Sequence, residues 1–433
     1  MLMKLFEHQI KALEDTKDFN RCAYYLDMGL GKTFVGSEKL KSLEGKINLV
    51  VCQKSKIKDW VEHFQEHYSV SVWDMSNKKS FEDFIIRART ILKGENFPQL
   101  VGVINYDIIF RRDILLKIPF DTLMLDESSV IQNETAKRSK CILKMNAKNV
   151  ILLSGTPTAG KYEKLWSQLR LLGWDITKKL YYSQYVEMEY IEDKASGFRI
   201  PKVTGYKNVD RLKYKLAKHG AVFQKSEEVF DLPQQQMTTV KTSVPKEYKK
   251  FMRDEMITID GYEFIGDTLL SKRIYARMIC GYLNKERLSA FADLLQSTED
   301  RLIVFYNYNQ ELFRLTQIAE NAERPVSVVN GHDKDLTAYE NDDNSVTFIQ
   351  YQAGAMGLNL QKANKIIYFS PTDRSELYEQ SKKRIHRIGQ DKTCFYYRLM
   401  CPGTVEEDIY KALELRKDYT DELFKKYQES YDR

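Results

Sequence analysis

The sequence has no run of about 18 consecutive apolar residues, so it predicts no membrane span. Its first 20 residues are amphipathic and acidic in part, and they lack the apolar core and small-residue cleavage site of a secretory signal. Internal repeats and low-complexity tracts are also absent. We therefore expect an intracellular protein without a membrane partner, cytoplasmic if its source is bacterial or viral.

Cysteine and histidine are scarce, with six of each, and no cysteine pair has C-x-x-C spacing. Several cysteines lie in apolar runs, where a reduced cysteine acts as a small hydrophobic side chain. These absences disfavour a zinc module or a disulfide framework. An excess of charge is absent too, since 67 basic against 61 acidic residues give a net charge of +6. That balance permits an acidic partner without requiring one.

What the chain does have is a regular alternation of short apolar runs with amphipathic helical stretches, in two series. Its 433 residues are enough for two or three domains. Strands that alternate with helices predict parallel sheets covered on both faces, so we predict an α/β fold with two tandem, doubly wound lobes. The predicted strands are Cys22–Leu26, Ile47–Cys52, Val101–Ile104, Thr122–Leu125 and Val150–Leu153, then Leu302–Tyr306, Val326–Val329, Val346–Gln350, Lys365–Phe369 and Phe395–Leu399.

The part between the two series is richer in tyrosine and charge and has helical periodicity. We predict lobe 1 over residues 1–235, with a helical insertion at about 172–235. Lobe 2 then covers residues 236–433, with a leading helical segment at about 246–297. The proline-containing segment Phe230–Pro245 is predicted to cross between the lobes and to enter lobe 2 as an extended strand.

A glycine-rich turn follows the first predicted strand, in AYYLDMGLGKTFVGSEKL. Gly29 and Gly31 let the backbone fold round phosphates, so that N–H groups and a helix N-terminus face negative charge. Lys32 can reach the β- and γ-phosphates, and the Thr33 hydroxyl can hold Mg²⁺. Because a strict G-x-x-x-x-G-K-[ST] motif has glycine where this chain has Leu26, an incidental turn stays open as the alternative. The predicted ATP contacts here are Met28, Gly29, Leu30, Gly31, Lys32 and Thr33.

Two adjacent carboxylates, Asp126 and Glu127, end the strand-like run TLMLDESS. Strand tips are where parallel α/β sheets present their ligands. Asp126 would complete the Mg²⁺ shell, largely through water, and Glu127 would align the attacking water. A helix cap is the alternative for this pair, and Lys32 and Thr33 disfavour it. The next strand ends in Ser154–Pro157, which either senses phosphate or only forms a turn.

The helix-like stretch SELYEQSKKRIHRIGQ places Gln380, Arg384 and Arg387 at i, i+4 and i+7, on one helical face. Two guanidiniums there can stabilise a transferring phosphoryl group, although a basic surface helix is the plainer alternative. Gly354 and Gly357, shortly before, suit close backbone approach to phosphates. With a phosphate loop in one lobe and arginines in the other, we expect the lobes to close on ATP before hydrolysis.

In their order, these motifs resemble the superfamily 2 helicase-like ATPases of the Swi/Snf type, over nearly the whole chain. DMGLGKT, LDESSVIQN, LLSGTPTAGKYEKLW and KSEEVFDLP resemble the family's phosphate loop, acid box, SGTP motif and the element before lobe 2. QAGAMGLNLQKANKIIYF and QSKKRIHRIGQ are closest, and R-x-H-R-I-G-Q is specific to this family. The resemblance implies RecA-like lobes that use ATP and Mg²⁺, with Gln9 reading adenine and further ATP contacts at Gly357 and Gln380.

VVCQKSKIKDWVEHF and VINYDII look like the family's strand-tracking motifs. The DNA contacts that the resemblance implies are Gln53, Lys54, Ser55, Asn105 and Tyr106 in lobe 1, with Gln352 and Gly354 in lobe 2. The chain departs from the family at Ser128–Ser129, where Ala or Gly followed by His is usual. It departs again at Gln350–Tyr351, which replace a Ser-Thr pair that touches a DNA phosphate.

We therefore expect an ATP-dependent, DNA-stimulated motor that translocates on double-stranded DNA and remodels or displaces bound factors. The alternatives are a strand-separating superfamily 2 DNA or RNA helicase and a nucleic-acid-binding assembly factor with weak ATPase. The H-R-I-G-Q signature favours the translocase, and the intact catalytic set disfavours the assembly factor. That set is Lys32, Asp126, Glu127, Arg384 and Arg387. The expected partners of this monomeric motor are duplex DNA and a protein displaced or recruited on it.

Overall fold

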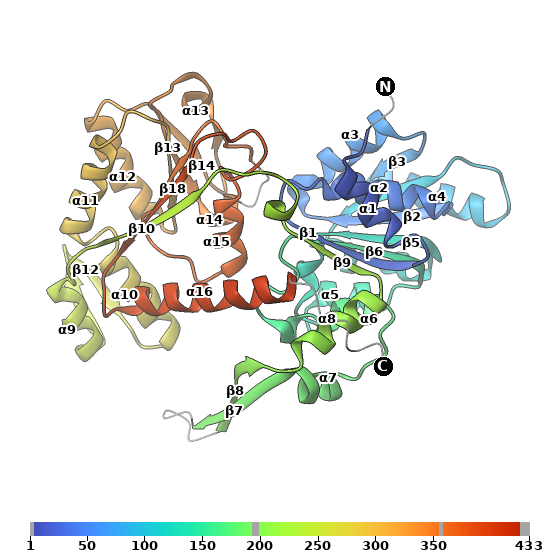
Figure 1. Cartoon of the computed structure of the whole chain (residues 1–433), viewed down its shortest axis with the longest axis horizontal. Helices are drawn as coiled ribbons and strands as arrows, with labels where there is room; N and C mark the ends of the chain where they lie inside the picture. Colours follow the sequence, from blue (N-terminus) through green and yellow to red (C-terminus); the bar gives the residue numbers. More distant parts are fainter. Residues whose placement is uncertain (1–3, 193–198, 355–357, 425–433) are drawn as a thin grey trace. The chain divides into compact units, whose positions relative to one another are not determined.

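The computed structural model describes residues 4–192, 199–354 and 358–424 and divides into two compact units (Figure 1). Unit 1 comprises residues 1–229 and 418–433, and unit 2 comprises residues 230–417. Each unit contains a seven-stranded sheet with helices, so the predicted class of tandem RecA-like α/β lobes is confirmed. The predicted lobe limits at 235 and 236 differ from this division in the crossover segment and at the C-terminal helix.

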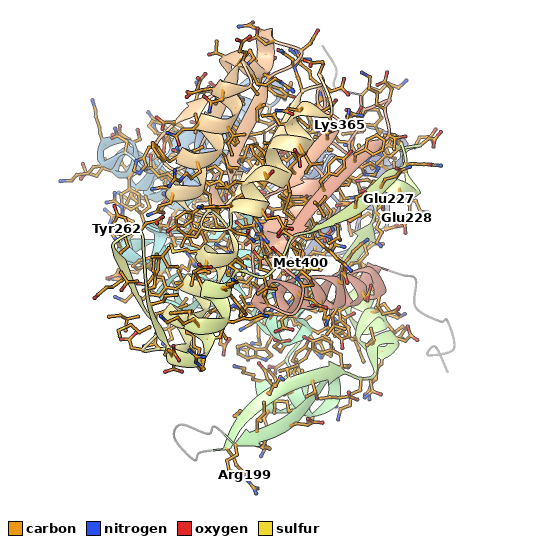
Figure 2. The ribbon with its side chains drawn as sticks, turned by 90° about the vertical axis from the view of Figure 1, so that its left-hand side faces the viewer. Arg199, Glu227, Glu228, Tyr262, Lys365 and Met400 are labelled. Carbon is orange, nitrogen blue, oxygen red and sulfur yellow. The ribbon has the colours of Figure 1, made fainter. Side chains whose placement is uncertain are left out.

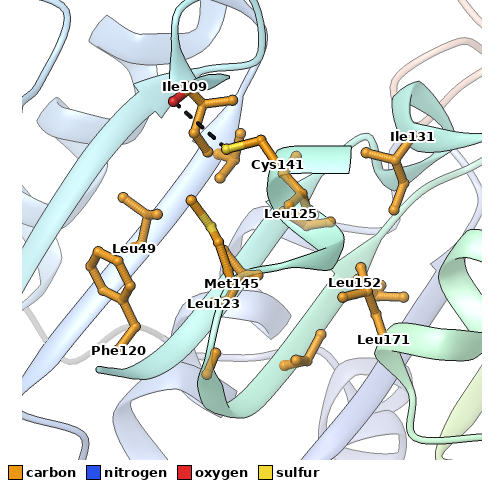
Figure 3. Close-up of a cluster of buried hydrophobic side chains, with 14 of the residues drawn as sticks. Leu49, Ile109, Phe120, Leu123, Leu125, Ile131, Cys141, Met145, Leu152 and Leu171 are labelled. Atoms are coloured by element: carbon orange, nitrogen blue, oxygen red, sulfur yellow. Dashed lines mark hydrogen bonds between the residues drawn. The ribbon is translucent and has the colours of Figure 1, made fainter. Parts of the chain in front are cut away.

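The sheet of unit 1 is parallel throughout, in the order β3-β4-β2-β5-β6-β1-β9. Every residue of β2 and β4 is buried, as expected where helices cover both faces of a parallel sheet. Figure 3 shows part of the apolar core, in which Leu49, Phe120 and Leu123 lie close to Met145. The strands are β1 (Arg21–Leu26), β2 (Ile47–Cys52), β3 (Ser71–Asp74), β4 (Leu100–Asn105), β5 (Phe120–Asp126), β6 (Ala147–Leu153) and β9 (Ala221–Gln224).

The helices of unit 1 alternate with its strands along the chain. They are α1 (Glu7–Glu14), α2 (Lys32–Ser42), α3 (Ile57–His67), α4 (Lys78–Leu92), α5 (Lys137–Leu143), α6 (Trp166–Leu171), α7 (Lys178–Tyr185) and α8 (Val209–Lys218). The helix α16 (Val405–Phe424) begins in unit 2, and its last residues belong to unit 1. Among the described residues, no helix is both long enough and apolar enough to cross a membrane.

The sheet of unit 2 has the order β10-β18-β17-β13-β16-β14-β15, and only β15 runs antiparallel to its neighbour among the described strands. The predicted crossover is confirmed, because β10 pairs in parallel with β18. All ten strands predicted from apolar runs are present in the two sheets. Those of unit 2 are β10 (Gln235–Lys241), β13 (Leu302–Tyr306), β14 (Val326–Val329), β15 (Lys334–Asp335), β16 (Val346–Gln350), β17 (Lys365–Tyr368) and β18 (Cys394–Met400).

A fully buried ion pair joins two helices of unit 2. Arg287, in α11, donates from Nη1 to Glu406 Oε1 at 2.7 Å and from Nη2 to Oε2, and both side chains are 0% exposed. Cys280 and Cys401 lie within 4.8 Å of Glu406, but the arginine already neutralises that carboxylate. All six cysteines are free and buried. The helices of this unit are α9 (Lys246–Asp254), α10 (Leu269–Cys280), α11 (Lys285–Gln296), α12 (Asn309–Asn321), α13 (Thr337–Asn341), α14 (Tyr351–Gly354), α15 (Ser375–Lys382) and most of α16.

The segment predicted to be helical between the two strand series also contains strands. β7 (Val186–Glu192) pairs antiparallel with β8 (Arg199–Tyr206), and β11 (Met256–Ile259) pairs with β12 (Tyr262–Ile265). Strand β9 adds an edge to the sheet of unit 1. Six of the seven residues of β7 are exposed, so no apolar run marks this strand in the sequence.

Candidate nucleotide-binding site

The phosphate-loop candidate connects β1 to α2 and requires glycine at two positions. Gly29 and Gly31 have φ of 88° and 73°, in the left-handed region that side chains disfavour. A Cβ atom on Gly31 would lie 2.1 Å from the side-chain nitrogen of Gln9, so any side chain there would displace the Gln9 amide. The helix α2 starts at Lys32, directly after this turn, and Thr33 is its second residue.

Gln9 holds this loop from α1 and is only 3% exposed. Its Nε2 donates to the carbonyl of Leu30 at 3.1 Å, and its Oε1 accepts from the Phe6 N–H at 3.0 Å. The loop is also fixed at Met28, whose carbonyl accepts from the Ser226 hydroxyl at 3.0 Å. The structure thus brings Gln9 to the loop, while its contact with adenine stays a prediction.

Lys32 lies across the loop, with neutral acceptors for its ammonium group. Its Nζ donates to the carbonyls of Leu26 at 2.9 Å and Asp27 at 3.1 Å. A Cβ atom on Gly155 would lie 3.3 Å from this Nζ, so the SGTP segment after β6 adjoins the phosphate loop. A phosphate can replace neutral carbonyls as the acceptor at low cost, so this arrangement fits the predicted role of Lys32.

The acid pair stands at the carboxyl end of β5, as predicted. Asp126 Oδ2 accepts from the indole N–H of Trp60 at 2.8 Å, and the Asp126 carbonyl accepts from the Tyr106 hydroxyl at 2.9 Å. Glu127 has a φ of 55°, and its Oε1 accepts from the hydroxyls of Ser129 and Ser154, each at 2.8 Å. Each carboxylate is therefore oriented by donors that surround it.

Burial and nearby charge have opposite effects on the pKa of these two carboxyl groups. Burial raises the pKa of both Asp126 and Glu127. The hydrogen bond from Trp60 and the positive charge of Lys32 lower the pKa of Asp126, and Lys32 with Ser154 lowers that of Glu127. Two neighbouring buried carboxylates suit a metal ion, because its positive charge would stabilise their ionised forms.

Ser128 and Ser129, which differ from the family pattern, both form hydrogen bonds at the site. Ser129 orients Glu127, and Ser128 donates to the Gln168 carbonyl oxygen Oε1 at 2.8 Å. The Gln168 amide in turn donates to the Pro157 carbonyl at 2.8 Å. The acid box and the SGTP segment are thus connected through Gln168. Our sequence analysis missed Gln168 and Trp60, because only the fold brings α6 and α3 to these strand ends.

The DNA-contact candidates of unit 1 divide into exposed and buried residues. Lys54 and Ser55 are exposed, at the turn after β2 that Gln53 precedes. Tyr106 is only 2% exposed and its hydroxyl donates to the Asp126 carbonyl, so this side chain packs in the core, and its contact with DNA stays a prediction. Asn105 is 4% exposed, and its Oδ1 accepts from the Ile108 N–H, three residues further along the chain, at 3.2 Å.

The candidates of unit 2 follow the ends of β16 and β17. The predicted helix through residue 390 is wrong in its second half, since α15 contains Gln380 but ends at Lys382. After that point the chain continues in turns, with the His386 N–H bonded to the Lys382 carbonyl at 3.3 Å, and the Arg384 carbonyl accepts from the Leu360 N–H at 3.2 Å. Arg384 and Arg387 therefore do not lie on one face of a helix with Gln380, although both belong to the segment that follows α15.

That segment lies against residues 358–363. Arg384 is 1% exposed and donates from Nη1 to the Leu358 carbonyl at 3.4 Å, and Arg387 Nη1 donates to Asn359 Oδ1. Gln390 Nε2 donates to the carbonyls of Gln361 at 3.1 Å and Ala363 at 2.8 Å. These bonds hold the two arginines on an ordered turn.

The remaining unit 2 candidates lie on or after α14. Gln352 is exposed and Gly354 ends the helix, whereas Gly357 lies outside the described residues. Tyr351 is 3% exposed and its hydroxyl donates to the Ser370 carbonyl at 3.1 Å. At the Gln350–Tyr351 departure from the family pattern, the Tyr351 ring therefore packs in the core and offers no surface on which a base could stack.

Comparison with known proteins shows the family to which the chain belongs. The family model of the SNF2-related domain matches residues 15–284, and that of the helicase conserved C-terminal domain matches residues 286–389. The DNA repair and recombination protein RAD26 of Saccharomyces cerevisiae is 23% identical, over 89% of this chain and 43% of its own length. The putative ATP-dependent helicase/translocase YwqA of Bacillus subtilis is 22% identical, over 92% of this chain and 46% of its own.

The chain therefore spans less than half the length of these two relatives. Among solved structures, the Sulfolobus solfataricus SWI2/SNF2 ATPase core in complex with dsDNA is 18% identical, with a TM-score of 0.45. That match covers 97% of this chain and 93% of the other.

Proposed function

The chain belongs to the SNF2-related family, and we propose from this that it is an ATP-hydrolysing motor stimulated by double-stranded DNA. The observation that carries the proposal is the meeting of three strand ends in unit 1. Lys32 after β1, Glu127 after β5 and Ser154 after β6 come together, with Glu127 bonded to Ser154 at 2.8 Å. In parallel α/β sheets such a convergence at the carboxyl edge forms the ligand site.

Each residue of this site has a task that its chemistry suits. Lys32 would bind the β- and γ-phosphates, exchanging its carbonyl acceptors for phosphate oxygens. Thr33 and Asp126 would hold Mg²⁺, which when bound neutralises charge on the phosphates. Glu127, oriented by two serine hydroxyls, would align the attacking water. Arg384 and Arg387 are proposed to stabilise charge on the transferring phosphoryl group.

We propose further that the motor tracks the duplex through phosphates and does not separate strands. The half-buried Gln53 and the exposed Lys54, Ser55 and Gln352 offer amide, hydroxyl and ammonium groups, which suit phosphate and sugar contacts. The two tyrosines that could have stacked on bases, Tyr106 and Tyr351, are buried and hydrogen-bonded to backbone. Stacking platforms are common in single-strand machines, so this burial favours translocation over unwinding.

The test is ATP hydrolysis measured with no nucleic acid, single-stranded DNA, duplex DNA and duplex RNA. We expect duplex DNA to stimulate most, and Lys32→Ala to remove the stimulated activity. Because phosphate contacts dominate, the stimulation should depend steeply on salt and little on base sequence. Equal stimulation by single strands would favour the strand-separating helicase, and no hydrolysis under any condition would refute the motor.

A further inference from the structure

A groove of ≈ 760 Å³ lies in unit 1 between the helix α7 and the hairpin β7–β8, away from the nucleotide site. The hairpin and α7 lie side by side in Figure 1, and Arg199 marks the first residue of β8 in Figure 2. The groove is large enough for several side chains of a ligand. None of the residues that line it takes part in the proposed motor chemistry.

The hairpin presents an apolar face to this groove. Val186, Met188 and Tyr190 alternate along β7, so they share one face, and all three line the groove. Their exposed fractions are 4%, 41% and 66%, increasing away from α7. Two-stranded hairpins are marginally stable alone, and exposed aromatic or aliphatic side chains on them are costly unless a partner covers them.

The helix side of the groove is basic. Lys178 and Lys179 of α7 and Lys207 after β8 line it, against a single carboxylate from Glu187. Lys178 already forms an ion pair with Glu134, and its Nζ lies 5.3 Å from the ring centre of Tyr182. Lys179 and Lys207 are exposed, and within the described ranges no ion pair is assigned to either. Their charges are therefore available to an acidic ligand.

We propose that this groove is a docking site for an acidic peptide segment of a partner protein that carries apolar side chains. The lysines would attract its carboxylates, while Met188 and Tyr190 would cover its apolar anchors. A nucleic acid suits the groove less well, because its charged backbone has no apolar side chains for Val186 and Met188 to cover. The proposal does not depend on the motor activity.

The experiment uses the full chain and fluorescein-labelled peptides, with binding followed by anisotropy. The probe peptide alternates aspartate and leucine. Two reference peptides replace its leucines by serine or its aspartates by lysine. We expect the probe to bind at least about tenfold more tightly than either reference, because it alone offers both charge and apolar anchors. Equal binding of the three peptides would overturn the proposal.

Variants then locate the site on the protein. The charge reversals Lys179→Glu and Lys207→Glu, made together, should weaken probe binding at least about tenfold, as should Met188→Ser with Tyr190→Ser. The matched control reverses Lys144 and Lys148, which are exposed elsewhere in unit 1, and should not change binding. Undiminished binding to both groove variants would overturn the proposal.

A labelled single-stranded oligonucleotide serves as the competing ligand. If the Lys179 and Lys207 reversals weaken oligonucleotide binding but not peptide binding, the groove binds nucleic acid and the proposal is wrong. DNA-stimulated ATP hydrolysis, measured on the same samples, should be unchanged in the groove variants. This readout separates a failure of the docking proposal from a failure of the proposed motor.

Discussion

At the scale of single residues, Glu127 sets the expected pH dependence. Burial raises the pKa of its carboxyl above the ordinary glutamate value, so the acid form persists to a higher pH. Since the ionised form is needed to align water, ATP turnover should fall on the acid side before ordinary glutamates protonate. Turnover against pH at saturating ATP and Mg²⁺ measures this. Glu127→Gln should cut turnover at least about a hundredfold and still bind ATP.

A second variant tests why turnover falls at acid pH. The Ser154 hydroxyl donates to the ionised Glu127 and lowers its pKa. In Ser154→Ala, turnover should therefore begin to fall at a higher pH. If turnover fell at the same pH in Ser154→Ala, or if the residual turnover of Glu127→Gln fell in the same way, protonation of Glu127 would not be the cause.

Trp60 is expected to position Asp126 for the metal. Its indole N–H is the donor to Asp126 Oδ2 at 2.8 Å, and it opposes the rise in pKa that burial causes. Trp60→Phe removes the donor and keeps an aromatic side chain, so the Mg²⁺ concentration for half-maximal hydrolysis should rise about tenfold. Trp73→Phe is the matched control, because Trp73 bonds to Ser71 outside the site. An equal Mg²⁺ dependence in both variants would rule out this role.

Sequence reasoning found the residues whose role depends on local spacing. Lys32 follows a glycine turn and Asp126 follows an apolar run, and both patterns can be read from adjacent positions. Trp60 and Gln168 could not be found in this way, since their partners are 66 and 40 residues distant in the chain. Only the strand order β2-β5-β6 brings their helices beside the acid box.

At the scale of elements, the early end of α15 changes how the two arginines are presented. Arg387 lies on a turn held by the segment around Asn359, not on a helical face. We still expect Arg387→Ala to lower ATP turnover at least about a hundredfold, because the guanidinium stabilises developing charge. Arg387→Lys should restore little, since an ammonium lacks the planar fork. Arg374→Ala, at the exposed start of α15, is the control, and an equal effect there would reject the assignment.

The buried ion pair between α11 and α16 should dominate the stability of unit 2. Glu406→Gln leaves Arg287 without its counter-charge, so the free energy of unfolding should fall by about 3–5 kcal/mol. Replacing both partners, with Arg287→Met and Glu406→Leu, should recover much of that loss. Glu414→Gln breaks the exposed pair with Arg398 and should cost less than about 1 kcal/mol. Urea unfolding measures all three, and equal losses for Glu406→Gln and Glu414→Gln would contradict the prediction.

The elements that sequence predicts best are those buried on both faces. The strands β2 and β13 are short, mostly apolar runs with every position buried, so their length and apolar character locate them. The hairpin β7–β8 is not predicted, because the predicted strands are apolar runs, whereas six of the seven residues of β7 are exposed and three of them are glutamates. The end of α15 also escapes, because it depends on a bond from residue 360 to the Arg384 carbonyl.

At the scale of the whole molecule, the proposal of a duplex motor depends on what the two units offer to nucleic acid. The exposed candidates carry polar groups suited to phosphates, and they give no means to distinguish base sequences. Their number is small, and no aromatic side chain among the predicted DNA contacts is exposed, since Tyr106 is buried. Under the proposed function, the motor would grip the outside of the double helix, and the candidate contacts among the described residues offer no exposed ring on which separated bases could stack.

This difference can be measured directly. A motor that tracks the duplex should displace a triplex-forming third strand in an ATP-dependent manner, because it moves along the groove that the strand occupies. It should not unwind a forked duplex under the same conditions, since separated strands need a stacking surface that holds their bases. Lys32→Ala should abolish displacement while the protein still binds duplex DNA, which separates movement from binding. Efficient unwinding of the fork, with single strands stimulating hydrolysis as strongly as duplex, would instead identify a strand-separating helicase.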